Sequence, residues 1–188
     1  MLKPLDEYGR FVEISGFRNV AIGDAKVFME SVCKDLPDGV EVQLFDADLV
    51  ATWEHLYYAA LNALMAFQNK RNASKTLAVE MALYASARRQ IKRAIEFIGV
   101  KSGSGNIAVV VLGSDEASVE AGLRVVAQRL GVEPDDGVLG LSEAKTVRIR
   151  GAFDVSDAEL QAVSACGDAE AALVDLVVER VALLSTRL

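Results

Sequence analysis

Residues 107–112 read IAVVVL, a run of six apolar residues that is rich in the β-branched types. A short continuous run of this kind is typical of a strand that is covered on both faces of a sheet. A flexible loop over residues 101–106 precedes the run, and Ser114 or Asp115 is placed to begin a helix that closes near Gly131. The sequence therefore predicts a central strand with helices packed around it.

Other strands are predicted from shorter patterns. Residues 40–44 and 147–150 each alternate apolar and polar side chains, as strands with one covered face do. Residues 10–17 and 20–22 are expected to form strands joined by a hairpin-like turn. Together these segments predict an α+β fold with a small antiparallel or mixed sheet of four to five strands.

About seven helices are expected to flank this sheet. The spacing of apolar residues predicts a long helix over residues 49–69, with Asp46 or Asp48 as its N-cap. Helices over residues 73–85 and 87–98 should follow, the second with Ser86 as N-cap.

Three further helix starts are predicted from capping residues. Asp24 and Asp168 are suitable N-caps for the first and last helices, and Ser156 with Glu159 matches a capping box. No repeat or linker divides the chain, so residues 1–188 are expected to form a single domain.

The amino-acid composition limits the metal sites and cofactors that the protein could hold. With one histidine and two cysteines among 188 residues, neither a structural metal nor another cofactor is predicted. Cys33 and Cys166 are interpreted as small buried apolar residues. The longest apolar run is far below the roughly 20 residues that span a bilayer, so a cytoplasmic protein without membrane contact is expected.

The distribution of charge is the most informative feature for function. The chain has 20 basic and 27 acidic residues, yet Glu80 is the only acid between residues 67 and 95. The basic residues in that window are Lys70, Arg71, Lys75, Arg88, Arg89, Lys92 and Arg93. Such a segment is typical of an anion-binding face, although pairing with the acidic remainder of the chain would also explain it.

On the predicted helix 87–98, Arg88 and Lys92 are four residues apart, as are Arg89 and Arg93. Like charges at this spacing cost an isolated helix a few tenths of a kcal/mol per pair, so the pattern favours a partner that supplies negative charge.

Single-stranded RNA is the anion that best fits the interleaved polar residues, because it is bound through stacking and directed hydrogen bonds. No helix-turn-helix or zinc-finger pattern is present, so DNA is not expected. Tyr84 and His55 could contact a ligand, but core packing and a structural hydrogen bond, respectively, are favoured. The candidate RNA-contact residues are Lys70, Arg71, Asn72, Ser74, Lys75, Arg88, Arg89, Gln90, Lys92 and Arg93.

Residues 42–100 also carry an ordered set of short motifs. They are Gln43-Leu44-Phe45-Asp46-Ala47 with Val50, His55-Leu56, Ala59-Ala60, Asn72-Ala73-Ser74-Lys75-Thr76-Leu77 with Glu80 and Tyr84, and Ser86-Ala87-Arg88-Arg89-Gln90-Ile91 with Ala94-Ile95 and Gly99. In their order and spacing they resemble the small regulatory subunit of the KEOPS complex, the family of the PRPK-binding protein.

The resemblance implies a function that composition does not show. KEOPS installs threonylcarbamoyl on the adenosine next to the anticodon of ANN-decoding tRNAs. Its small subunit is not the catalyst: it docks on the kinase-like subunit and, in archaeal-type members, is similar to a module that holds the tRNA 3′ CCA end.

The resemblance thus implies a non-enzymatic, tRNA-binding regulatory subunit. An apolar stripe on the last predicted helix is the expected docking surface for the kinase-like subunit: Leu173, Leu176, Val177, Val181 and Leu184. Two alternatives stay open. The basic helices could dock an acidic protein without any RNA contact, or, more remotely, an enzyme could be built around His55 and Glu80.

Overall fold

The computed structural model describes residues 1–103, 105–164 and 168–187. A four-stranded antiparallel sheet with the strand order β1-β2-β4-β3 lies at its centre. The strands are β1 (Leu2–Leu5), β2 (Arg10–Phe17), β3 (Glu41–Asp46) and β4 (Ile107–Gly113). With eight α-helices among the described residues, the chain has the predicted α+β fold.

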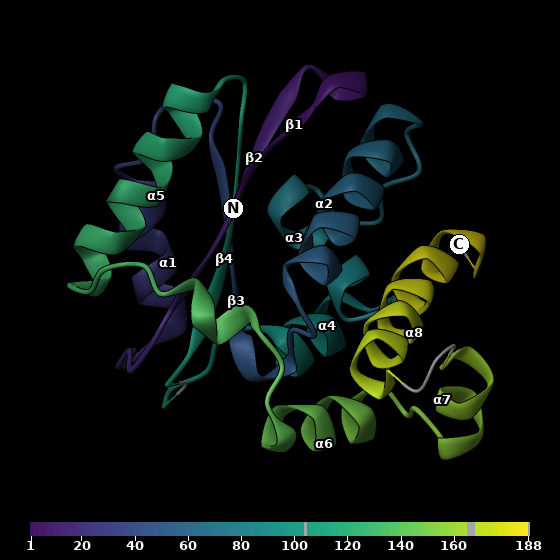
Figure 1. Cartoon of the computed structure of the whole chain (residues 1–188). Helices are drawn as coiled ribbons and strands as arrows, with labels where there is room; N and C mark the ends of the chain where they lie inside the picture. Colours follow the sequence, from purple (N-terminus) through teal and green to yellow (C-terminus); the bar gives the residue numbers. More distant parts are fainter. Residues whose placement is uncertain (104, 165–167, 188) are drawn as a thin grey trace.

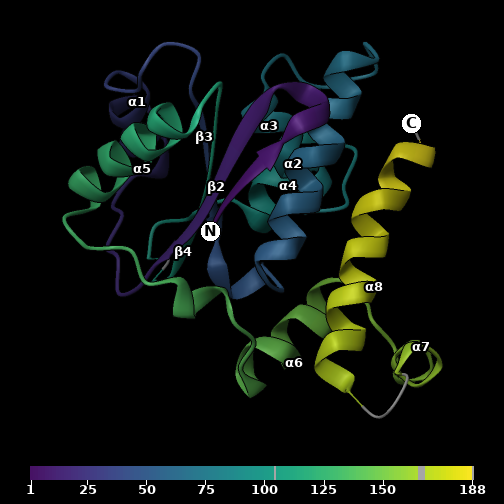
Figure 2. The ribbon, with the colours of Figure 1, turned by 45° about the horizontal axis from the view of Figure 1, so that its top comes forward.

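The helices form layers on both faces of the sheet (Figure 1). Helices α1 and α5 cover one face, α2, α3 and α4 cover the other, and α8 packs outside α2 with α6 and α7 near its first turns (Figure 2). The bounds are α1 (Ala25–Cys33), α2 (Trp53–Gln68), α3 (Leu77–Ala85), α4 (Ile91–Ile98), α5 (Glu116–Leu130), α6 (Glu143–Ala152), α7 (Asp157–Val163) and α8 (Ala169–Leu184).

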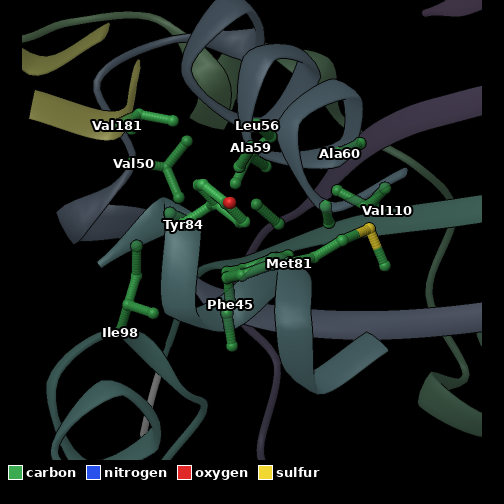
Figure 3. Packing of buried hydrophobic residues seen from close by; sticks show 14 of the residues in the cluster. Phe45, Val50, Leu56, Ala59, Ala60, Met81, Tyr84, Ile98, Val110 and Val181 are labelled. Carbon is green, nitrogen blue, oxygen red and sulfur yellow. The ribbon is translucent and has the colours of Figure 1, made fainter. Parts of the chain in front are cut away.

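Strand β4 is the central strand that its apolar run predicts, and every one of its residues is buried. Val109 and Val111 pack with residues of α1 and α5, whereas Val110 and Leu112 pack with residues of α2, α3 and α8. Figure 3 shows this second layer, in which the sheet meets the helices. Burial on both faces explains why β4 has no polar alternation.

Two of the predicted strands are wrong. Residues 20–22 form no strand, and β2 instead makes its hairpin with β1 through the 3₁₀ turn Asp6–Tyr8. Residues 147–150 lie inside α6, where the side chain of Ser142 caps the helix by accepting a hydrogen bond from the N–H of Lys145. Only one side of α6 is buried, so a few alternating residues resemble a strand there.

The cap residues of α1, α5, α7 and α8 are confirmed, including the reciprocal bonds between Ser156 and Glu159. Asp46, however, caps the 3₁₀ turn Ala47–Leu49, and α2 begins only at Trp53. None of the described helices has the length and apolar character needed to cross a membrane.

The prediction for Cys33 is wrong, because its side chain is exposed at the end of α1. Val32 is the single fully buried residue of that helix, and Ala25, Phe28 and Met29 pack partly buried beside it. Cys166 lies outside the described residues.

Candidate functional site

The basic window folds into α3 and the segments at its two ends. Nine helical residues span about 13 Å, so the structure separates the window into two clusters. We call Lys70, Arg71, Asn72 and Lys75, before α3, the first basic cluster. The second basic cluster, after α3, comprises Arg88, Arg89, Gln90, Lys92 and Arg93.

Each cluster begins where a helix ends in the same backbone motif. Lys70 and Ala87 adopt left-handed conformations, with φ of 55° and 51°. The N–H of the next residue then bonds back into the last helical turn, from Arg71 to Ala66 O at 2.8 Å and from Arg88 to Leu83 O at 3.1 Å. These Schellman motifs turn the chain sharply and carry Arg71 and Arg88 away from the helix axis.

The loop of the first cluster is organised around Glu80. The buried carboxylate of Glu80 accepts hydrogen bonds from the N–H groups of Ala73 and Ser74, the latter at 2.7 Å. The hydroxyl of Ser74 lies 2.7 Å from the same carboxylate and is buried. Ser74 therefore shapes the loop, and its predicted role as an RNA contact is wrong.

The C-terminal end of α3 is bonded to His55 of α2. The ring nitrogen Nδ1 of His55 accepts a hydrogen bond from the N–H of Ala51 at 3.2 Å, which leaves the proton of the neutral ring on Nε2. Nε2 donates to the carbonyl of Ala85, 2.7 Å away in the last turn of α3. Complete burial lowers the pKa of His55 to about 4. The prediction that His55 is a hydrogen-bonded structural residue is thus confirmed.

Arg88 and Arg89 precede α4 instead of lying on it, because the helix begins at Ile91 with Gln90 as N-cap. The predicted helix start at residue 87 is therefore wrong, and the two like-charge pairs inferred for that helix do not form along α4. The guanidinium of Arg88 stacks on the ring of Phe97 at 4.0 Å, and its Nε is buried without a hydrogen-bond partner. A hollow of about 380 Å³ beside Arg88 is lined on its far side by residues such as Phe153 and Glu179.

Six of the seven basic residues of the window are not paired with an acid in the described part of the chain. Lys92 lies 3.9 Å from Glu96, and none of the other six forms an ion pair with a described acid. All seven are exposed except Arg88, which is partly covered by Phe97. The alternative of internal pairing therefore fails for these residues, and their charge is available to an external partner.

A family model described as "Kinase binding protein CGI-121" matches residues 17–185 of this chain. The chain belongs to the CGI-121 family. It is also 33% identical over 117 residues to the regulatory protein Cgi121 of Methanocaldococcus jannaschii, a match that covers 62% of this chain and 72% of that protein. The suspected resemblance is thereby confirmed at the level of the family.

The apolar stripe of α8 is not exposed in the fold of this CGI-121 family member. Leu173, Leu176 and Val177 pack with residues of α6 and α7, and Val181 and Leu184 pack with the main core. All five side chains are buried. The stripe is apolar because α8 closes the fold, so its interpretation as an exposed surface is wrong.

The sequence interpretation missed two exposed residues of α4. Ile91 and Ile95 are 42% and 38% exposed, and they lie beside Lys92 and Arg93. Their spacing of four residues on a helix with a marked basic side was the available signal. Tyr84, in contrast, is buried in the core, as the sequence predicts.

The described residues of this family member bring together no group of three or more histidine, cysteine, aspartate or glutamate side chains that could hold a metal ion. The site is therefore characterised by exposed positive charge and two apolar side chains. Such a surface can bind an anion and pack against flat apolar groups.

Proposed function

We propose that this protein is a non-catalytic regulatory subunit of the KEOPS tRNA-modification complex, which binds the kinase-like subunit and the 3′ CCA end of tRNA in the cytoplasm. The observation that carries the RNA part is the set of seven basic residues in an acidic chain, of which all but Arg88 are exposed and all but Lys92 lack an ion pair with a described acid. A local positive surface of this kind binds RNA through its phosphates while the rest of the molecule repels it.

The second basic cluster is the better candidate for contact with the RNA end. Arg89 and Arg93 neutralise phosphates, while Gln90 can hydrogen-bond to a base edge and Ile91 offers an apolar surface to it. The hollow beside Arg88 is large enough for a terminal nucleotide to enter it.

The family description supports the protein partner, because CGI-121 proteins are described as kinase-binding and the archaeal relative is named a regulatory protein. A non-catalytic role agrees with the state of His55, whose two ring nitrogens are both engaged inside the core. An imidazole held in this way cannot reach a substrate proton.

The test is filter binding of tRNA with an intact CCA end and of tRNA trimmed of those three nucleotides. Because stacking contributes roughly 1 to 3 kcal/mol per base, trimming should weaken binding by about tenfold or more. The double variant Arg89→Glu with Arg93→Glu should bind both RNAs weakly. It should also lower the salt dependence, whose log-log slope is about −0.7 per phosphate neutralised.

The matched control is Lys26→Glu with Lys34→Glu. Both lysines are exposed, on α1 or at its end, across the sheet from the second basic cluster. Each double variant replaces two basic residues with glutamate, so the change in net charge is identical. Affinity in this control should stay close to that of the original protein. An equal loss in both double variants, or equal affinity for intact and trimmed tRNA, would contradict binding of the RNA end.

A pure protein-interaction module is the second candidate, favoured by the exposed Ile91 and Ile95 beside the basic residues. In that case the Arg89→Glu, Arg93→Glu variant loses the kinase-like subunit in co-purification, while tRNA binding is absent from the start.

A further inference from the structure

The outer edge of β3 borders a hollow of about 800 Å³, which is within the size range of ligand-binding pockets. In the sheet β3 pairs with β4, and on its other side it makes only an isolated bridge from Phe45 to Gly99, so the outer side of residues 41–44 is an edge. One wall of the hollow comes from α1, including Met29, and the other from α3 and α4, including Val79 and Ile95. Figure 2 shows β3 with α1 on one side and α3 on the other.

The register of the sheet determines which peptide groups of β3 point into this groove. In antiparallel strands, successive residues direct their N–H and C=O to opposite sides. Ile14 exchanges hydrogen bonds with Met1, so its N–H and C=O point away from β4. Ile14 pairs with Val110, which in turn pairs with Gln43. The alternation therefore turns the peptide groups of Val42 and Leu44 away from β4 and towards the groove.

These outward groups are only partly satisfied. The carbonyl of Leu44 accepts a hydrogen bond from the side-chain Nε2 of Gln43 at 2.9 Å. Within the described residues, the N–H and C=O of Val42 and the N–H of Leu44 have no hydrogen-bond partner. Val42 and Leu44 are each 2% exposed, so these groups lie at the bottom of the groove.

We propose that this groove binds an extended segment of a partner polypeptide, which adds a fifth strand beside β3. A ligand without hydrogen-bonding groups would cover the peptide groups of Val42 and leave them without water or partner, which is costly. A polypeptide backbone instead supplies a C=O and an N–H at the spacing of a strand. Its alternating side chains would contact Met29 on one wall and Val79 on the other.

A second copy of this chain fits the groove less well. Its β3 lies between the same two helical walls, and these would meet the walls of the first copy before the strands approached to about 4.8 Å. A single extended segment has no such walls.

The test uses a display library of random dodecapeptides, selected on the whole protein, followed by affinity measurement with the selected synthetic peptide. Val42→Pro removes an N–H that points away from β4, so the ladder between β3 and β4 is retained. Val42→Ala is the matched control, because it shortens the same buried side chain and keeps the N–H.

The selected peptides should contain consecutive β-branched or apolar residues. Val42→Ala should bind them within about threefold of the original protein, and Val42→Pro about tenfold or more weakly, because hydrogen bonds at the edge are lost. In the unmodified protein, saturating peptide should slow amide hydrogen exchange at Leu44 by about tenfold or more, a measurement that does not depend on how the variants fold.

Three results would overturn the proposal. They are a selection without enriched peptides, equal affinities of the Val42→Pro and Val42→Ala variants, and self-association that Val42→Pro abolishes. Peptide affinity should also be unchanged by Arg89→Glu with Arg93→Glu, since neither arginine lines the groove. The strand-addition proposal and the RNA proposal can therefore fail separately.

Discussion

Acidification should destabilise this protein through His55, the only histidine of the chain. Its side chain is fully buried, and its two ring nitrogens bond to the N–H of Ala51 and the carbonyl of Ala85. Protonation would place a hydrogen on Nδ1, directly against the N–H of Ala51. Burial is the main cause that lowers the pKa to about 4, from an ordinary value of 6.5.

The size of the effect follows from these two pKa values. Between pH 6.5 and pH 4 the unfolded chain carries a proton on His55 that the folded chain does not, so stability falls as the pH falls. The free energy of unfolding should be about 2 kcal/mol lower at pH 5 than at pH 7.5, and the loss should approach about 3 kcal/mol near pH 4.

Urea unfolding at several pH values between 7.5 and 5 measures this loss, with His55→Gln as the comparison. The variant lacks the titrating ring, and its free energy of unfolding should depend less on pH by about 2 kcal/mol over that range. Asp115, Asp135 and Glu159 have lowered pKa values, so they titrate below this range. An NMR titration of the single imidazole with a midpoint near 6.5, or equal pH dependence in both proteins, would refute the reasoning.

Two further predictions concern the helix ends and the core. Ala87→Gly should raise the free energy of unfolding by up to about 1 kcal/mol, because glycine adopts the left-handed conformation without steric cost, whereas Ala85→Gly inside α3 should lower it by about 1 kcal/mol. Leu184→Glu should lower it by about 3 kcal/mol or more in thermal or urea unfolding, because it buries an unpaired charge. The adjacent and 37% exposed Leu183→Glu should change it by less than about 1 kcal/mol, and similar losses in the two variants would contradict the burial of the α8 stripe.

The features that could be predicted from the sequence are those encoded over a few neighbouring residues. The run in β4 indicates a doubly covered strand by itself, and Asp24, Ser156 and Asp168 are sufficient to place helix starts. Each signal depends on side chains that act on their own backbone, so no knowledge of the rest of the fold is needed.

The wrong predictions concern segments whose structure or burial depends on contacts with distant parts of the chain. Alternation in residues 147–150 fits both a strand and a helix of which only one side is buried, and packing of Ile149 against α8 selects the helix. The α8 stripe could be core or docking surface, and only the position of α2 and α7 shows that it is core. Cys33 is exposed because α1 turns Ala25, Phe28, Met29 and Val32 towards the sheet, and Cys33 lies outside this face of the helix.

The division of the basic window into two clusters had no sequence signal, and its cause lies in α3. From Glu80 to Ala85 every residue of that helix is buried, so no charged side chain can be presented along its length. Charge can reach the surface only beyond its ends, where Lys70 and Ala87 turn the chain outward without the glycine that usually marks such a turn. Because Glu80 and His55 fasten these two ends by buried hydrogen bonds, both clusters are presented on rigid supports. If the RNA-binding proposal holds, a surface fixed in this way would recognise the shape of an RNA end as well as its charge.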